Sequence, residues 1–233
     1  MYSRTFTIKS TDVTIKRTLR PSVLLTMSQE AAAAHAAELG AGKEKTLDRG
    51  FLWVIARQEL KINRMPEYAE TVTLETWPGK AMHMLFPRYT RLLDKNGEEL
   101  AAISAVWTLM DVNTRAMINP EKEGIAVPGE KTENDLPLPQ KIKSIAVTDS
   151  VEYTVPFSAA DLNGHLGNMH YLDIAEDCIN DISSSRDPKI IRCEYSNEIL
   201  YRENVTISFG SDGSRYYFSG DGDRHKFSLL FEY

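Results

Sequence analysis

The order of predicted secondary structure is the same in the two halves of this chain, and this repetition limits the folds that it can adopt. Each half shows a strand, one helix and then several strands, and a proline-rich segment separates the halves. Three pairs of apolar residues agree at one constant shift: Leu19 with Leu166, Leu25 with Leu172, and Met27 with Ile174. A repeated element order indicates an internal duplication. One helix that buries its apolar face on an antiparallel sheet predicts an α+β fold.

Local signals predict the individual elements. A helix is expected from Pro21 to Gly40, because proline suits the first turn, glycine suits the end, and the alanines between them favour helix. The turn Lys95-Asn96-Gly97 between two apolar runs predicts a hairpin. In the second half, an apolar face near helical period predicts a helix over residues 167–183.

Residues 119–143 contain four prolines and many charges, which is typical of a linker or a surface crossing. We therefore expect an N-terminal repeat over residues 1–120, a linker over 121–143 and a C-terminal repeat over 144–233. A chain of 233 residues is long enough to bury a sizeable core.

Composition excludes several classes of protein. With 42% hydrophobic and 26% charged residues, the chain resembles ordinary globular proteins. Its formal net charge of −6 does not favour nucleic acid or an anionic membrane as a partner. No stretch approaches the roughly 18–20 apolar residues of a membrane span, and the N-terminal segment lacks the apolar core of a signal peptide. We expect a cytoplasmic protein that binds neither nucleic acid nor membrane.

The side chains that commonly ligate metals are dispersed. Cys178 and Cys193 form no metal-binding pair with each other or with histidine, so both are expected to be buried thiols in a reducing compartment. None of the five histidines forms a metal pair with a carboxylate at helical spacing. We expect neither a metal nor another cofactor.

The segment DLNGHLGN, residues 161–168, carries most of the candidate chemistry. It lies between a predicted strand and a predicted helix. In an extended backbone alternate residues point the same way, so Asp161, Asn163 and His165 would share one side. These residue types also begin turns and helices, so a purely structural role is the alternative.

Three backbone N–H groups follow this trio at the predicted start of the helix, those of Leu166, Gly167 and Asn168. Free N–H groups there could stabilise a developing oxyanion. The functional interpretation is favoured because the trio occurs in one half only. The aligned residues of the first half are Thr14, Lys16 and Thr18.

Glu198 is the fourth candidate. It is predicted inside a strand, among apolar and aromatic neighbours such as Tyr195 and Ile199. Such a carboxylate lies either on a solvated strand face or in a site. The aligned residue of the first half is Asn63, so this acid too occurs in one copy only.

DLNGHLGN and EYSNEI resemble the D-x-N-x-H-x-N-N and E-Y-x-x-E-C motifs of the acyl-acyl-carrier-protein thioesterases of bacteria and plant plastids. Residues 50–78 and 89–117 are similar to the same family, so the resemblance covers almost the whole chain. It implies two tandem hotdog repeats, each an antiparallel sheet wrapped around a long helix. It also implies hydrolysis of a fatty acyl thioester on acyl carrier protein, which ends fatty-acid elongation by releasing a free fatty acid.

The chain departs from the plant members at Ile199, where they have cysteine. A nucleophilic thiol is therefore missing at this place, and water activated by Glu198 as general base is the expected mechanism. Asn163 would hold the carbonyl or the water, His165 would position water or transfer a proton, and Asp161 would orient its neighbours.

Two further sets of residues follow from this interpretation. The first would line the acyl tunnel: Val23, Met27 and Trp53. The second would form a basic surface for the acidic carrier protein: Lys16, Arg17 and Arg20, or Arg186, Lys189 and Arg192. Alternatives are an acyl-CoA thioesterase, a non-catalytic acyl-binding hotdog protein and, less favoured, a dehydratase. A monomer or a homodimer is expected.

Overall fold

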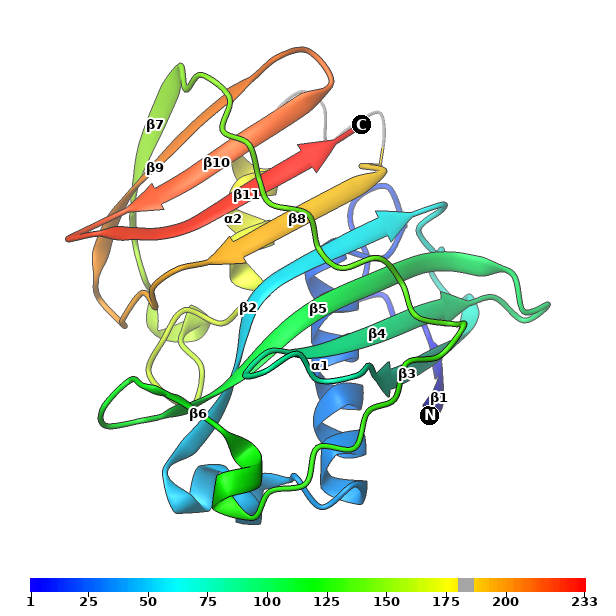
Figure 1. Ribbon diagram of the computed structural model, residues 1–233. Helices are drawn as coiled ribbons and strands as arrows, with labels where there is room; N and C mark the ends of the chain where they lie inside the picture. Colours follow the sequence, from blue (N-terminus) through cyan, green and yellow to red (C-terminus); the bar gives the residue numbers. More distant parts are fainter. Residues whose placement is uncertain (180–186) are drawn as a thin grey trace.

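The computed structural model describes residues 1–179 and 187–233, which form one curved antiparallel sheet around two helices (Figure 1). The first half contains β1 (Tyr2–Thr7), α1 (Pro21–Glu38), β2 (Phe51–Ile62), β3 (Thr71–Pro78), β4 (Phe86–Leu93), β5 (Glu99–Asp111) and β6 (Met117–Ile118). The second half contains β7 (Asp149–Thr154), α2 (His170–Cys178), β8 (Ile190–Tyr195), β9 (Asn204–Ser211), β10 (Arg215–Asp221) and β11 (His225–Glu232).

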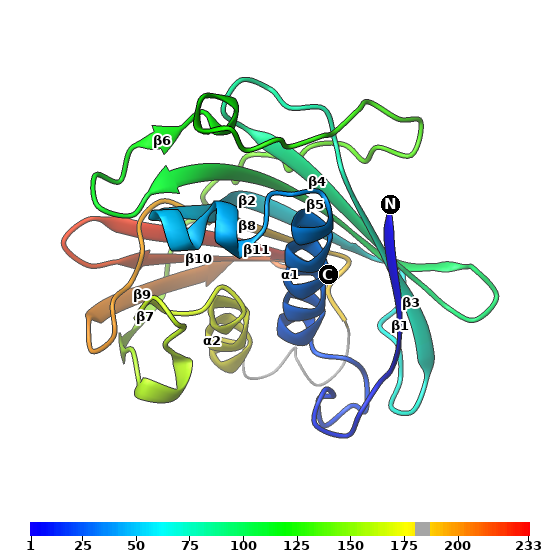
Figure 2. The same cartoon turned by 90° about the horizontal axis from the view of Figure 1, so that it is seen from below.

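The strands follow the order β1-β3-β4-β5-β2-β8-β11-β10-β9-β7, and β6 pairs with β5. Figure 2 shows α1 and α2 side by side on the concave face of this sheet. One hydrophobic core includes residues of both helices and of strands from both halves, such as Leu25, Leu60, Leu172 and Phe218. The expected α+β arrangement is therefore confirmed, with the two halves sharing the larger of two hydrophobic clusters among the described residues.

The predicted start of α1 at Pro21 is confirmed, and the helix ends at Glu38, two residues before the predicted Gly40. Gly40 has φ +80°, a left-handed conformation that glycine adopts without strain, so it terminates the helix. The predicted hairpin is also present, because Gly97 has φ +85° in the turn between β4 and β5.

Helix α2 starts at His170, later than the predicted residue 167. The reason is that the backbone before it bonds to neighbouring segments: Leu166 N–H donates to Ile199 O, and Gly167 N–H donates to Ala159 O. Residues 180–183 of the predicted helix lie outside the described residues.

The two halves join where β2 pairs with β8. Glu59 lies directly opposite Arg192, and Arg192 Nε is 2.6 Å from Glu59 Oε2. Both side chains are buried, with relative exposures of 2% and 10%. Arg192 Nη1 also pairs with Glu232. The seam between the halves is thus a continuous strand ladder with a buried ion pair.

The segment before β7 covers this seam from outside. Figure 1 shows it crossing the face of the sheet opposite to the helices, over β2 and β8. Gln140 N–H donates to Glu59 Oε2 at 3.4 Å, and Ile142 N–H donates to Glu194 Oε1 at 3.2 Å. The divisions at residues 120 and 144 stay a prediction, because the sheet continues from β2 to β8. No helix in the described ranges is long and apolar enough to cross a membrane.

The seam ion pair gives a stability prediction. Arg192→Met leaves Glu59 buried without its close partner, which costs about 3–5 kcal/mol of unfolding free energy. The double variant Glu59→Leu/Arg192→Met should recover most of that loss. Urea denaturation measures both effects. Arg64→Met, which breaks the pair between exposed Arg64 and half-buried Glu70, is the control and should cost only about 1 kcal/mol. A similar cost for Arg192→Met and Arg64→Met would contradict the importance of the seam pair.

Glu176 on α2 gives a pH prediction. Burial raises the pKa of Glu176 from 4.5 to about 7, and the nearby Asp173 acts in the same direction. The folded protein therefore binds more protons than the unfolded chain between pH 4.5 and about 7, and stability falls as pH rises through this window.

Glu176→Gln removes this titration, so the variant should be more stable than the natural protein above pH 7. The two proteins should converge below pH 4.5, where the carboxyl is protonated in both states. Chemical denaturation at several pH values measures the difference. A difference that does not change with pH would show that Glu176 is not the titrating group.

Candidate active site

Residues 161–168 form a closed turn, so the expectation of an extended backbone there is wrong. Asp161 Oδ1 accepts the N–H groups of Asn163 at 2.8 Å and His165 at 3.1 Å. Asp161 N–H donates to His165 O at 2.7 Å. Gly164 has φ +75° within the turn, which favours glycine. Asp161 therefore holds the backbone of the trio, while Asn163 Nδ2 lies 3.4 Å from Asp161 Oδ2.

His165 meets Glu198 because the turn pairs with the segment after β8. Leu200 forms a β-bridge with His165, and Tyr201 N–H donates to Gly164 O at 2.8 Å. As a result His165 Nδ1 lies 2.8 Å from Glu198 Oε2. Glu198 lies three residues beyond Tyr195, the last residue of β8, so its expected place inside a strand is wrong.

The first half adds a cation to this pair. Arg115 Nη2 lies 2.7 Å from Glu198 Oε1. Arg115 is in the turn after β5, where Asp111 Oδ1 accepts the N–H groups of Asn113 and Thr114. Sequence reasoning missed Arg115, because a turn residue gives no signal of the distant strand end that it contacts.

The expected oxyanion donors are only partly available. Leu166 N–H donates to Ile199 O at 2.8 Å, and Gly167 N–H donates to Ala159 O at 3.0 Å. The expectation that these two groups are free is therefore wrong. Among the three candidates, Asn168 alone has an N–H group without a protein acceptor in the described part of the chain.

Both cysteines are free thiols, and neither is placed as a nucleophile. Cys193 is buried at 1% relative exposure, and burial raises the pKa of its thiol to about 12. Cys178 is half-buried, and burial raises the pKa of its thiol as well. A thiolate is thus disfavoured at both places.

Apolar side chains are exposed around the turn. Leu162 lies within it and Phe157 precedes it, and each is 82% exposed. Leu200 and Tyr201 follow Glu198 and are 49% and 37% exposed. Phe157 and Tyr201 pack edge to face with ring centroids 6.0 Å apart. Large apolar side chains exposed together commonly mark a surface that meets a partner.

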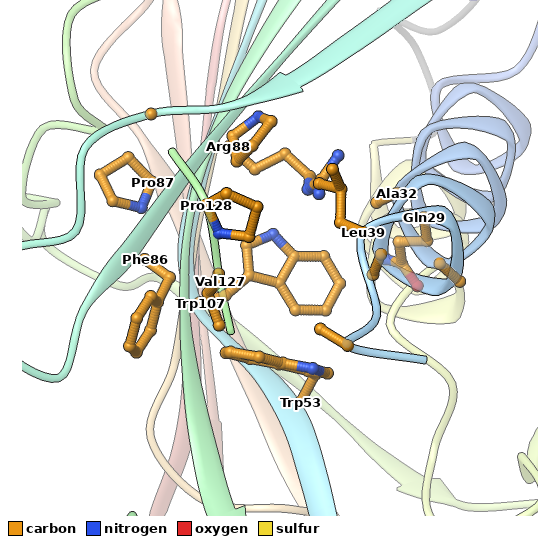
Figure 3. A pocket seen from close by; sticks show the side chains of 15 residues that line it. Gln29, Ala32, Leu39, Trp53, Phe86, Pro87, Arg88, Trp107, Val127 and Pro128 are labelled. Atoms are coloured by element: carbon orange, nitrogen blue, oxygen red, sulfur yellow. The ribbon is translucent and has the colours of Figure 1, made fainter. Parts of the chain in front are cut away.

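The three candidates for the acyl tunnel lie in different places. Trp53 lines a cavity between α1 and the sheet (Figure 3). Met27 is a member of the main core, and Val23 packs against that core.

The candidate basic surface needs a correction at Arg192, which is buried in the seam and cannot meet a partner. Lys16 is 3.5 Å from Asp187, while Arg17, Arg20 and Lys189 are exposed. Arg186 lies outside the described residues.

Solved structures identify the class of the fold. An acyl-ACP thioesterase from Bacteroides thetaiotaomicron aligns with a TM-score of 0.82 at 18% identity, covering 99% of this chain and 96% of that one. A 12:0-ACP thioesterase from Umbellularia californica aligns with a TM-score of 0.83 at 22% identity, with the same coverage of 99% and 96%. The protein is therefore of the double hotdog class.

Family models define its place more narrowly. The model described as the acyl-ACP thioesterase N-terminal domain matches residues 1–127, and the model of the C-terminal domain matches residues 142–225. The chain belongs to the acyl-ACP thioesterase family.

Two plant relatives illustrate the sequence similarity. A chloroplastic palmitoyl-acyl carrier protein thioesterase from Cuphea hookeriana is 25% identical over 224 residues, which cover 89% of this chain and 54% of that protein. A chloroplastic dodecanoyl-[acyl-carrier-protein] hydrolase from Cinnamomum camphora is 27% identical over 236 residues, covering 91% and 60%. The chain thus spans little more than half the length of these relatives.

Proposed function

We propose that this protein hydrolyses a fatty acyl thioester of acyl carrier protein to a free fatty acid and the carrier-protein thiol, and so ends fatty-acid elongation. The observation that carries the proposal is the contact of His165 with Glu198 at 2.8 Å, within a chain of this family. A histidine paired with a carboxylate can activate water without a covalent intermediate. The cytoplasm is the proposed compartment, since both cysteines are free thiols.

The contacts of Glu198 suggest separate catalytic roles for Glu198 and His165. One carboxylate oxygen faces His165 Nδ1 and the other faces Arg115. Glu198 would accept the Nδ1–H of the imidazole, which leaves Nε2 as the ring nitrogen that takes a proton from water. We therefore propose His165 as the base and Glu198 as the group that orients it, which revises the role that the sequence suggested for Glu198.

The reaction then proceeds in two steps. The water oxygen attacks the thioester carbonyl carbon as its proton passes to His165 Nε2. The C–S bond breaks next, and the leaving thiolate takes that proton from His165. The Asn168 N–H group is the proposed donor to the oxyanion, and Asn163 is a second candidate through its side-chain amide.

Arg115, a residue of the first half, is proposed to position Glu198 for this reaction. Its guanidinium fixes the carboxylate of Glu198 from the side opposite to His165. A carboxylate held on both sides has little freedom to leave the imidazole, so the pair is preorganised before substrate binds.

The catalytic pair gives a prediction about turnover. Glu198→Gln should lower kcat by about a hundredfold or more, because a neutral amide stabilises the imidazolium poorly. His165→Ala should lose at least as much, and added imidazole should restore part of its activity. Release of free fatty acid from acyl carrier protein measures both.

Glu152→Gln, which changes a carboxylate on β7 outside the site, is the control and should keep its activity. Near-normal turnover in folded Glu198→Gln would exclude the catalytic pair. Rescue of Glu198→Ala by formate, without rescue of His165→Ala by imidazole, would instead make Glu198 the base.

The carrier protein should dock beside the exposed apolar side chains of the turn. Arg202 is exposed next to Tyr201, and its Nε donates to Tyr201 Oη at 3.0 Å. It therefore borders the catalytic turn and can attract an acidic partner. Arg17 and Arg20 are the exposed alternatives suggested by the sequence.

Charge reversal separates these surfaces. Arg202→Glu should raise KM for acyl carrier protein several-fold and leave the rate on the acyl N-acetylcysteamine thioester unchanged, because that small thioester lacks the acidic surface. Arg17→Glu tests the alternative in the same assay. Equal loss on both substrates would point to damage at the site, and preference for acyl-CoA would identify the rival substrate.

A further inference from the structure

The connection between β8 and β9, residues 196–203, carries the carboxylate of Glu198 outside the ladder of the sheet. A catalytic side chain must be held within about 0.5 Å of its productive geometry. Because this connection lacks the regular hydrogen bonds of a strand, other bonds must supply that precision. The structure shows them on two sides of the connection.

The first side is the catalytic turn. Leu166 N–H donates to Ile199 O, and Tyr201 N–H donates to Gly164 O, both at 2.8 Å. These bonds fix the connection relative to His165, which belongs to the same turn. They do not fix it relative to the sheet.

Lys226 on β11 provides the second side. Figure 1 shows β11 beside β8, the strand that leads into the connection. Lys226 O accepts the N–H groups of Ser196 at 2.8 Å and Asn197 at 3.0 Å. Lys226 Nζ donates to Glu198 O at 3.3 Å. Three successive residues of the connection are therefore bonded to one lysine of the sheet.

The side chain of Lys226 is buried, with a relative exposure of 6%. Lysine is rarely buried without a charged partner. Its Nζ lies 2.5 Å from Glu203 Oε1 and 2.9 Å from Asp223 Oδ1. Burial acts to lower the pKa of Lys226, but the bonds to Asp223 and Glu203 together outweigh burial and raise it. Lys226 is therefore a fixed positive charge near pH 7.

Glu203 gives Lys226 a second route to the connection. Its other oxygen, Oε2, accepts the N–H group of Leu200 at 2.8 Å. Lys226 thus acts on the backbone on both sides of Ile199, directly at Glu198 O and through Glu203 at Leu200 N–H. The space around the lysine is narrow, because a Cβ atom at Gly222 would lie 3.0 Å from Lys226 Cε.

We propose that Lys226 is a positioning residue that holds Glu198 against His165. It contacts the backbone of Glu198 and not its carboxylate, so it acts on the reaction only through Glu198. This inference rests on the proposed function, because it assigns a further residue to the same catalytic pair.

Loss of Lys226 should affect turnover more than substrate binding. Without the ammonium group, Glu198 O loses its donor and Glu203 loses the cation that holds it in place. The carboxylate of Glu198 is then free to move away from the imidazole. A displacement of about 1 Å can cost roughly a hundredfold in rate. Lys226→Met should therefore lower kcat by about tenfold or more, while KM for the acyl carrier protein substrate changes by less than about twofold.

Arg192→Met is the matched control. Arg192 is also a buried cation of the sheet, and it also pairs with two carboxylates, Glu59 and Glu232. This variant should lose stability and keep kcat at temperatures where it stays folded. Lys226→Met/Glu203→Gln is the second test, since it removes the uncompensated charge of Glu203 and keeps an oxygen for Leu200 N–H. It should regain stability without regaining kcat.

Proton NMR of the His165 imidazole gives a readout that does not depend on hydrolysis. The Nδ1–H proton that bonds to Glu198 should give a downfield resonance, which is assigned by its loss in Glu198→Gln. This resonance should disappear by exchange with water in Lys226→Met and persist in Arg192→Met.

The outcomes separate this inference from the proposed function. Loss of the resonance in Lys226→Met, with no hydrolysis by the natural protein, would support the role of Lys226 and refute the proposed activity. Hydrolysis by the natural protein, with an unchanged resonance in Lys226→Met, would refute the role of Lys226 whatever its kcat. Recovery of kcat in the double variant would also overturn the inference, because Lys226 would then only neutralise Glu203.

Discussion

The pairing of β2 with β8 is the interaction on which the rest of the structure depends. It converts two helix-and-sheet repeats into one sheet, and the Glu59–Arg192 pair is buried within it. A buried ion pair is stable only when its charges are close and its remaining oxygens are hydrogen-bonded. The backbone N–H group of Gln140 donates to Glu59 Oε2 from the outer face of the sheet. The covering segment therefore stabilises the seam as well as connecting the halves.

This seam also explains why the candidate active site draws on both halves. Once β2 lies beside β8, the turn after β5 approaches the segment after β8, and Arg115 reaches Glu198. The second half supplies the imidazole of His165 and the carboxylate of Glu198, while the first half supplies the guanidinium of Arg115. Residues from both halves can contribute to one site because the two halves share one hydrophobic cluster and are held in a fixed relative position.

The sequence predicted the elements whose signals are local. The start of α1 at Pro21 and the hairpin at Gly97 depend on backbone angles that single residues prefer, and both were predicted correctly. The late start of α2 was missed, because Leu166 and Gly167 give their N–H groups to acceptors brought near by folding. Periodicity alone could not show that these backbone groups were already used.

The membership of His165 and Glu198 in a single cluster was a prediction from motif and asymmetry, and the structure places them 2.8 Å apart. The burial of Arg192 in the seam and the contact of Arg115 with Glu198 had no counterpart in the sequence. The sequence does not show whether a charged residue is solvated or paired, because the strand register determines which residues become its neighbours.

The sequence by itself determined the duplicated α+β architecture, the positions of its turns and the residue types available for acid–base chemistry. Only the tertiary structure decided which charges meet and which backbone N–H groups stay free. The physical reason is distance along the chain. Local preferences act between residues a few positions apart, whereas Glu59 and Arg192, or Arg115 and Glu198, become neighbours only after the whole sheet has formed.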